Sequence, residues 1–120
     1  MQDDKLQMTM LFDFFGELLT GKQHEYCDLY YNEDLSLSEI ASITGITRQG
    51  VYDIITRASK TLMDIEQKTG VVARWRETRQ ELERAEALAQ KLLNLIDGTG
   101  ESADIAHDLI NTLGKIANDN

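Results

Sequence analysis

The residue types best suited to binding chemistry gather in one short stretch near the middle of the chain. Arg48 and Gln49 follow Thr47, a residue type that commonly begins helices, so they fall in the exposed first turn of a predicted helix. Arginine pairs well with guanine, and glutamine with adenine, when such a helix enters the major groove of DNA. Further along the same helix, an aromatic and an acidic side chain would face the groove and two basic ones could reach phosphates. The candidate nucleic-acid or partner-binding residues are therefore Arg48, Gln49, Tyr52, Asp53, Arg57 and Lys60.

The distribution of charge limits the kind of partner that these residues could bind. The net charge is −9, and residues 1–46 carry two basic and nine acidic side chains. Residues 92–120 carry one basic and five acidic side chains, whereas residues 47–91 carry nine and seven. This balance argues against a protein that coats nucleic acid, and a carboxylate at Asp53 is unfavourable beside duplex phosphates. Any anion-binding face should lie in the middle third of the chain.

The elements that must position these residues have the pattern of a helix-turn-helix at residues 35–62. Ser36-Leu37-Ser38-Glu39 has the form of a capping box, so a short helix is expected to begin there and to stop at Gly45. Ala41 is small enough for two helices to cross closely, and Gly45 tolerates the positive φ that a sharp turn requires. The wedge between the two helices is expected to be filled by Ile40, Ile46, Val51 and either Ile54 or Ile55.

Helical periodicity extends over the rest of the chain. The chain has no proline, and the spacing of its apolar residues predicts further helices at about residues 5–19, 22–31, 47–68, 71–96 and 102–117. No segment shows the alternation of a strand, and no internal repeat is present. The expected fold class is all-α: a helix-turn-helix followed by a long helix and a C-terminal helix.

The second half of the chain is expected to be an appendage. Residues 1–70 should form a helical domain that contains the helix-turn-helix at about 36–62, and residues 71–120 a separate pair of helices. Along the first of these, residues at alternating steps of three and four form a heptad-like seam from Trp75 to Ile96, which predicts a homodimer. The alternative is that the last helix folds back and covers the seam within one chain.

The helix-turn-helix resembles that of region 4 of bacterial sigma factors, where a similar Leu-Ser-x-x-Glu-Ile-Ala run precedes the turn. A closer resemblance, to the YlxM family of small bacterial proteins linked to the signal recognition particle, covers roughly residues 10–68. It includes Leu11-Phe12-Asp13-Phe14, Leu18-Leu19-Thr20, Lys22-Gln23, Leu29-Tyr30-Tyr31, Ser36-Leu37, Glu39-Ile40-Ala41 and above all Arg48-Gln49-Gly50-Val51-Tyr52-Asp53. The resemblance implies a sigma region 4-like fold of the winged-helix-like class.

One residue departs from the pattern of the YlxM family. Gly50 stands where that family is expected to carry alanine. Glycine inside a helix costs about 1 kcal/mol relative to alanine. The helix is therefore expected to be softer at this position or to approach something closely there.

The YlxM resemblance implies an accessory or regulatory role in the signal recognition particle pathway. The residues themselves show no acid–base pair, nucleophile or metal cluster, so the protein is expected to be non-enzymatic, and the single cysteine favours the cytoplasm. The implied partner is the RNA of the particle or its GTPase. The alternative is a transcriptional regulator that reads a DNA sequence through Arg48 and Gln49. A regulator should protect a defined, two-fold symmetric duplex site, whereas an accessory protein should show no preferred duplex sequence.

Residues that could carry other chemistry are assigned structural roles. His24 and His107 have no metal-ligand neighbours at suitable spacing, so no metal site is predicted. Cys27 is expected to be a half-buried helix residue, and as the only cysteine it fits a reducing cytosol. The glycines near residue 100 lack the lysine and strand of a phosphate-binding loop, so no cofactor is predicted. The longest apolar stretch, residues 6–19, is interrupted by acidic side chains, which predicts neither a signal peptide nor a membrane span.

Two repeated patterns are interpreted as packing and solvation. The tyrosines Tyr26, Tyr30, Tyr31 and Tyr52 recur at helical spacing, which favours core packing over stacking on RNA bases. Arginine and glutamate alternate along residues 74–86, which is typical of a solvated helix face. A basic ribbon for RNA is the alternative for that segment.

Overall fold

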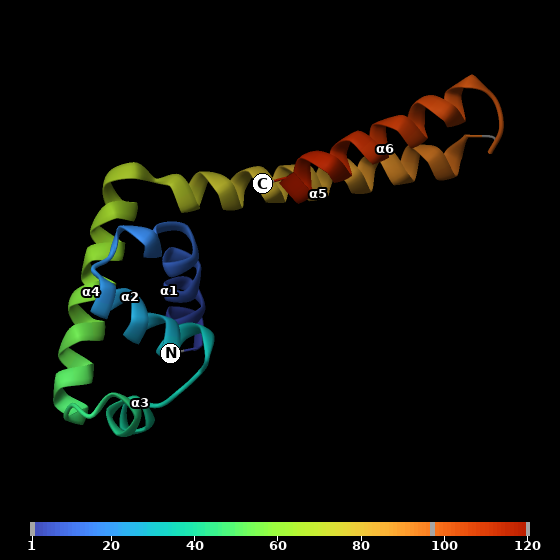
Figure 1. Cartoon of the computed structure of the whole chain (residues 1–120). Helices are drawn as coiled ribbons and strands as arrows, with labels where there is room; N and C mark the ends of the chain where they lie inside the picture. The colour runs from blue at the N-terminus through green and yellow to red at the C-terminus, as the bar shows by residue number, and fades with distance from the viewer. Residues whose placement is uncertain (1, 97, 120) are drawn as a thin grey trace. The chain divides into compact units, whose positions relative to one another are not determined.

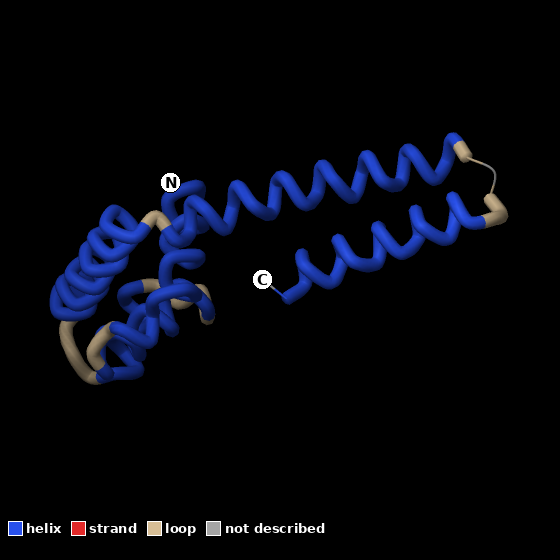
Figure 2. The backbone as a smooth tube through the Cα atoms, turned by 90° about the horizontal axis from the view of Figure 1, so that it is seen from above, coloured by secondary structure: helices blue, strands red, loops and turns tan. Residues whose placement is uncertain are grey.

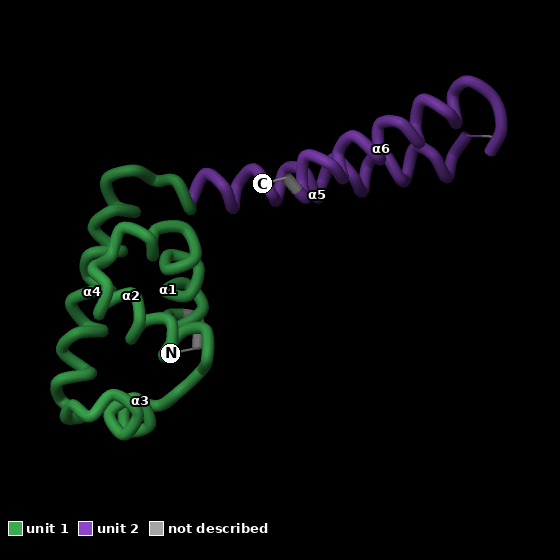
Figure 3. Tube along the Cα trace, in the orientation of Figure 1, with its two compact units in different colours: residues 1–72 green, residues 73–120 purple. Residues whose placement is uncertain are grey.

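The computed structural model describes residues 2–96 and 98–119, and its regular elements are all helical (Figure 1). The described residues contain no strand, so the all-α class predicted from the sequence is confirmed (Figure 2). The chain divides into two compact units, residues 1–72 and residues 73–120 (Figure 3). In chain order the elements are α1 (Gln2–Phe15), the 3₁₀ turn η1 (Gly16–Leu18), α2 (Gly21–Cys27), the π-helical turn η2 (Asp28–Asn32), α3 (Leu37–Thr44), α4 (Arg48–Thr69), α5 (Val71–Leu95) and α6 (Glu101–Asp119).

Local hydrogen bonds set the limits of the helix-turn-helix, which consists of α3 and the start of α4. The Ser36 hydroxyl accepts a hydrogen bond from the N–H of Glu39 at 3.1 Å, and the Glu39 carboxylate accepts one from the N–H of Ser36 at 3.0 Å. The bond from the N–H of Ser36 is the main reason that the pKa of Glu39 lies below its ordinary value. α3 ends at Gly45, whose φ of +79° is the left-handed conformation expected at that turn. The Thr47 hydroxyl then accepts the N–H of Gly50 at 3.0 Å and begins α4. The predicted capping box, turn glycine and second cap are confirmed.

The wedge between α3 and α4 is filled by the first of two buried clusters. Ile40 and Val51 are completely buried, Ile55 is 6% exposed, and Tyr26 of α2 is 4% exposed. The predicted wedge residues Ile46 and Ile54 lie at its edge and are half-buried. A single small core thus joins α2, α3 and α4, and it fixes which side of α4 faces inward.

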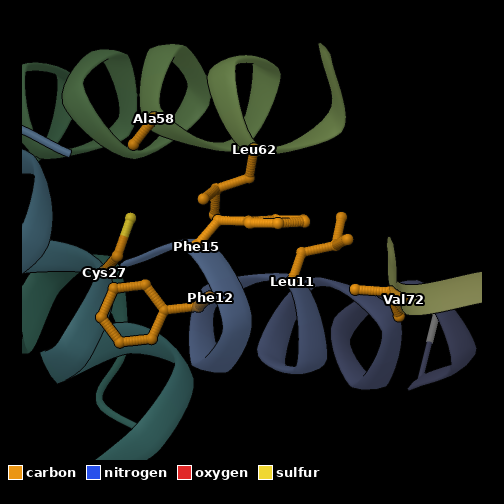
Figure 4. Close-up of a cluster of buried hydrophobic side chains, with 7 residues drawn as sticks. All are labelled: Leu11, Phe12, Phe15, Cys27, Ala58, Leu62 and Val72. Atoms are coloured by element: carbon orange, nitrogen blue, oxygen red, sulfur yellow. The ribbon is translucent and has the colours of Figure 1, made fainter. Parts of the chain in front are cut away.

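A second cluster joins α1 to the middle of α4 (Figure 4). Cys27 lies inside this cluster with no exposed surface, so the expectation that it would be half-buried was wrong. The reason is that α1 and α4 both contribute side chains to this cluster and enclose the end of α2. Ala58 and Leu62 of α4 are also completely buried there. The members of this cluster are Leu11, Phe12, Phe15, Cys27, Ala58, Leu62 and Val72.

The first helix is shorter at its C-terminal end than the periodicity indicated. It was expected to reach residue 19, but α1 ends at Phe15 and η1 follows, closed by a bond from the N–H of Leu19 to the carbonyl of Gly16 at 3.1 Å. The ring of Phe12 packs over Gly16, where an added Cβ would lie 3.0 Å from the ring. A glycine at this position therefore lets the chain tighten before it turns.

The second helix also differs from its expectation at residues 22–31. The α-helical part ends at Cys27, and η2 continues with a wider turn, in which the N–H of Glu33 bonds the carbonyl of Asp28 at 3.1 Å. The wider turn brings the adjacent Tyr30 and Tyr31 both against the core. Amphipathic periodicity at 3.6 residues cannot indicate such a turn.

α6 runs back antiparallel along α5 in the second unit (Figure 2). The fully buried residues of this unit are small: Ala89 is 4% exposed, Ala103 is 2% exposed and Ala106 is 4% exposed. Arg79 donates a hydrogen bond to the carbonyl oxygen of Ala117 at 2.6 Å, satisfying a carbonyl in the last turns of α6. Within this unit α6 therefore covers part of the predicted seam in the same chain.

Val51→Asp tests the role of the wedge. It places an unpaired charge at a completely buried position, so we expect the free energy of unfolding to fall by roughly 4 kcal/mol or more. Ile43→Asp introduces the same side chain on α3, where Ile43 is 65% exposed, and should change stability by about 1 kcal/mol or less. Urea denaturation followed by circular dichroism measures both, and equal losses in the two variants would contradict the assigned core.

Candidate nucleic-acid interface

The six sequence-predicted site residues all lie exposed on α4. Arg48 and Gln49 occupy its first turn, immediately after the Thr47 cap. The others follow through Lys60, so the set extends along about 18 Å of helix. Gln49, Asp53, Arg57 and Lys60 lie on the side opposite the buried Val51 and Ile55, whereas Tyr52 lies on the flank and Arg48 next to the edge of the buried stripe. The structure thus leaves every member of the predicted set exposed, spread over about half of the helix circumference. This set is called the α4 surface below: Arg48, Gln49, Tyr52, Asp53, Arg57 and Lys60.

Two residues of the α4 surface are paired with each other. The side-chain amide of Gln49 donates a hydrogen bond to the Asp53 carboxylate at 3.0 Å. Both side chains are exposed, and such pairs one helical turn apart contribute only about 0.2–0.5 kcal/mol. The Gln49 carbonyl stays available as an acceptor. Asp53 therefore orients a neighbouring amide, a role that the sequence did not indicate.

Gly50 is surrounded by the cap that begins α4. A Cβ added at this position would lie 3.1 Å from the Thr47 hydroxyl oxygen and 3.5 Å from the Cδ1 atom of Ile46. The close approach expected at Gly50 is therefore an approach to the turn that precedes α4. This contact opposes the stability that alanine would otherwise add to the helix.

A groove lined by tyrosines adjoins the α4 surface. Tyr52 is 49% exposed at its edge, and Lys60 lines the same hollow of about 470 Å³. Tyr30 and Tyr31 form its inner wall, with their rings edge to face at a centroid distance of 5.0 Å. The Tyr31 hydroxyl hydrogen-bonds the Ser59 hydroxyl at 2.8 Å, and burial raises the pKa of Tyr31. Of the four tyrosines, only Tyr26 is fully inside the core.

The contribution of α1 to this region was not predicted from the sequence. Lys5 lies 4.7 Å above the ring of Tyr30 and bonds the Asp34 carboxylate at 2.6 Å, which holds the pKa of Asp34 below its ordinary value. Asp34 itself adopts a positive φ of 57°. These residues are far apart in sequence, and the only signal available was the adjacency of two tyrosines at residues 30 and 31.

Other polar residues considered in the sequence lie away from the α4 surface. Arg79 lies over the Trp75 ring at 5.1 Å as well as bonding Ala117, so it is engaged within the second unit. His24 lies 3.6 Å from Glu17 and against the ring of Phe12. Among the described residues no group of histidine, cysteine, aspartate or glutamate is arranged to hold a metal ion. None of the described helices is long and apolar enough to cross a membrane.

The fold and the exposed start of α4 define a helix-turn-helix protein. Residues 2–101 match the model of the UPF0122 family, described as helix-turn-helix proteins of the YlxM / p13 type. The chain belongs to this family, as the YlxM resemblance predicted.

Curated relatives support the same assignment. A UPF0122 protein of Caldanaerobacter subterraneus subsp. tengcongensis is 48% identical over 84 residues, which is 70% of this chain and 72% of that protein. One from Desulforamulus reducens is 38% identical over 100 residues, covering 82% of this chain and 80% of the relative. A third, from Clostridium novyi, is 34% identical over 116 residues, covering 97% and 94%. The likeness therefore extends through the second unit.

Cys27 should be unreactive in the folded protein. Burial raises the pKa of its thiol from 9.0 to about 11, which lowers the thiolate fraction at pH 8 by about a hundredfold. Enclosure in the α1–α4 cluster blocks access as well. We expect a thiol-reactive dye to label Cys27 at least 100 times more slowly in buffer than in 6 M guanidinium chloride. Rapid labelling without denaturant would contradict the packing of α1 over this residue.

Proposed function

We propose that this protein is a non-enzymatic accessory protein of the signal recognition particle pathway that acts in the cytoplasm. It binds the RNA of the particle or its GTPase through the α4 surface. The observation that carries the proposal is that α4 keeps six polar or aromatic side chains exposed around the stripe of residues that is buried in two clusters. The YlxM resemblance supports the choice of partner.

Charge favours this partner over generic duplex DNA. The chain has a net charge of −9, and Asp53 lies on the α4 surface itself. Strong binding to duplex phosphates needs many basic contacts, whereas Arg48, Arg57 and Lys60 can neutralise only a few. A folded RNA or a protein surface can be recognised with fewer phosphate contacts, through shape and side-chain complementarity.

Sequence-specific DNA binding is the second candidate. It is favoured by Arg48 and Gln49, which lie exposed directly after the N-cap of the second helix of the motif, where recognition helices contact base edges. A DNA-binding role would also make use of two copies, since dimers read two half-sites.

The proposal includes a homodimer. Residues 1–70 carry the binding surface, and residues 71–120 provide the contact between two copies. The apolar side chains that remain exposed on α5 and α6 support this division of roles.

A titration separates the two candidates. Labelled particle RNA, the particle GTPase and random duplex DNA are each titrated with the full-length protein at low and physiological salt. We expect tighter binding to the RNA or the GTPase than to the DNA. RNA binding should weaken only shallowly with salt, because few phosphates are neutralised. Tight, footprinted binding to one DNA site, with no affinity for RNA or GTPase, would instead assign the protein as a transcriptional regulator.

Variants of α4 test whether this helix makes the contact. Arg48→Ala and Gln49→Ala should each raise the dissociation constant by roughly tenfold, as expected for a lost contact worth about 1–3 kcal/mol. Their stability should change by about 0.5 kcal/mol or less, because both side chains are exposed. Lys68→Ala is the control, since it removes an exposed charge from the last turn of the same helix. Unchanged binding in both test variants would exclude the α4 surface.

A further inference from the structure

The hairpin of α5 and α6 has an apolar side that is not buried in the contact between the two helices. Six large aliphatic side chains there are 42–77% exposed. They repeat at intervals of three, four or seven residues, which is the spacing of one helix face. A contiguous patch of exposed apolar side chains typically marks an interaction site. The residues of this hairpin face are Leu88, Leu92 and Leu95 of α5 and Ile105, Leu109 and Ile116 of α6.

The two helices present these side chains on the same side of the hairpin. Leu88 comes one residue before the buried Ala89, and Ile105 comes one residue before the buried Ala106. Successive residues of a helix are rotated by about 100° around its axis. In two antiparallel helices, the residues that directly precede the two contact residues therefore point to the same side of the pair. The Arg79–Ala117 bond sets the register, which places Leu88 level with Leu109. The two sets therefore form one continuous face.

We propose that the hairpin face binds the same face of a second copy, with α5 of one copy lying over α6 of the other in a four-helix bundle. This inference rests on the proposed homodimer and names its surface. A two-fold axis parallel to the helices generates the arrangement. Rotation about this axis does not change the height of a residue along the helices, so residues at the same height in one copy meet at that height in the dimer. Leu88 then lies against the partner subunit's Leu109, and the apolar face of each copy is covered by its own equivalent.

The charges beside the hairpin face select this arrangement. Near the turn of the hairpin, Arg84 and Lys91 are exposed along its edge on α5, whereas Glu101 and Asp108 are exposed along its edge on α6. Farther from the turn the signs are reversed, with Glu81 exposed on α5 and Lys115 on α6. When α5 lies over the partner's α6, the basic edge meets the acidic edge, and symmetry repeats the match on the other side. When α5 lies over the partner's α5, basic edges meet each other and acidic edges meet each other. Charge complementarity therefore favours a second copy in one orientation.

The mass of the full-length protein at 0.1–100 µM, measured by light scattering and sedimentation, tests the inference. We expect twice the 13.6 kDa of one chain. Leu92→Asp should raise the dimer dissociation constant by at least about a hundredfold, because it buries an unpaired charge twice in each dimer. Its helix content should not change, since Leu92 is 53% exposed within the chain. Gln90→Asp adds a charge to an exposed position on the opposite side of α5 and should leave the dimer unaffected.

A charge exchange tests the orientation. Lys91→Glu should weaken the dimer by about tenfold, and adding Asp108→Lys should restore it. A monomeric wild-type protein at 100 µM would overturn both the homodimer and the hairpin face. A dimer that tolerates Leu92→Asp would overturn the face alone, and a loss in Lys91→Glu that Asp108→Lys does not restore would overturn the orientation. Binding of RNA or GTPase through α4 is measured separately and does not depend on these outcomes.

Discussion

The rotation of α4 about its own axis is fixed by two buried clusters that contact it at successive turns. Val51 and Ile55 pack against α2 and α3, and Ala58 and Leu62 pack against α1 and α2. These positions are three or four residues apart, so only one rotational setting of the helix buries them all. The opposite side must then face solvent. The α4 surface is therefore a consequence of where the apolar residues lie, and it keeps its place as long as both clusters are intact.

The first turn of α4 is locally less stable than the first turn of a typical helix. Its first turn contains the basic Arg48 and no acidic residue, although the positive end of the helix dipole favours acidic side chains there. Gly50 adds the entropic cost of a glycine in a helix. The Thr47 cap and the Gly45 turn compensate by fixing the backbone on the preceding side. A first turn that is locally unfavourable but firmly anchored is expected where a basic side chain serves recognition.

The sequence allowed the helix-turn-helix and its exposed residues to be predicted because their signals are local. The capping box at Ser36, the glycine at 45 and the buried positions of α4 act within a few residues of each other. Three features depended on contacts between distant segments and could not be predicted this way: the complete burial of Cys27 under α1, the π-helical turn at residues 28–32, and the cation at Lys5 over the tyrosine groove. The capping box formed by Thr20 and Gln23 is also a local signal, but it was not recognised in the sequence. On α5 the periodicity indicated an apolar seam. It could not show that α6 buries one side of α5 and leaves the apolar residues of the hairpin face exposed.

Amide chemical shifts of the ¹⁵N-labelled full-length protein, recorded with and without the particle RNA or its GTPase, test the central claim most directly. If α4 carries recognition, the largest changes should fall on residues 48–60, with smaller ones at Tyr30 and Tyr31 beside them. The amides of the second unit should change little when the same partner is added. Changes confined to α6 or to the N-terminal half of α1, with residues 48–60 unaffected, would contradict the assignment of the α4 surface as the binding site.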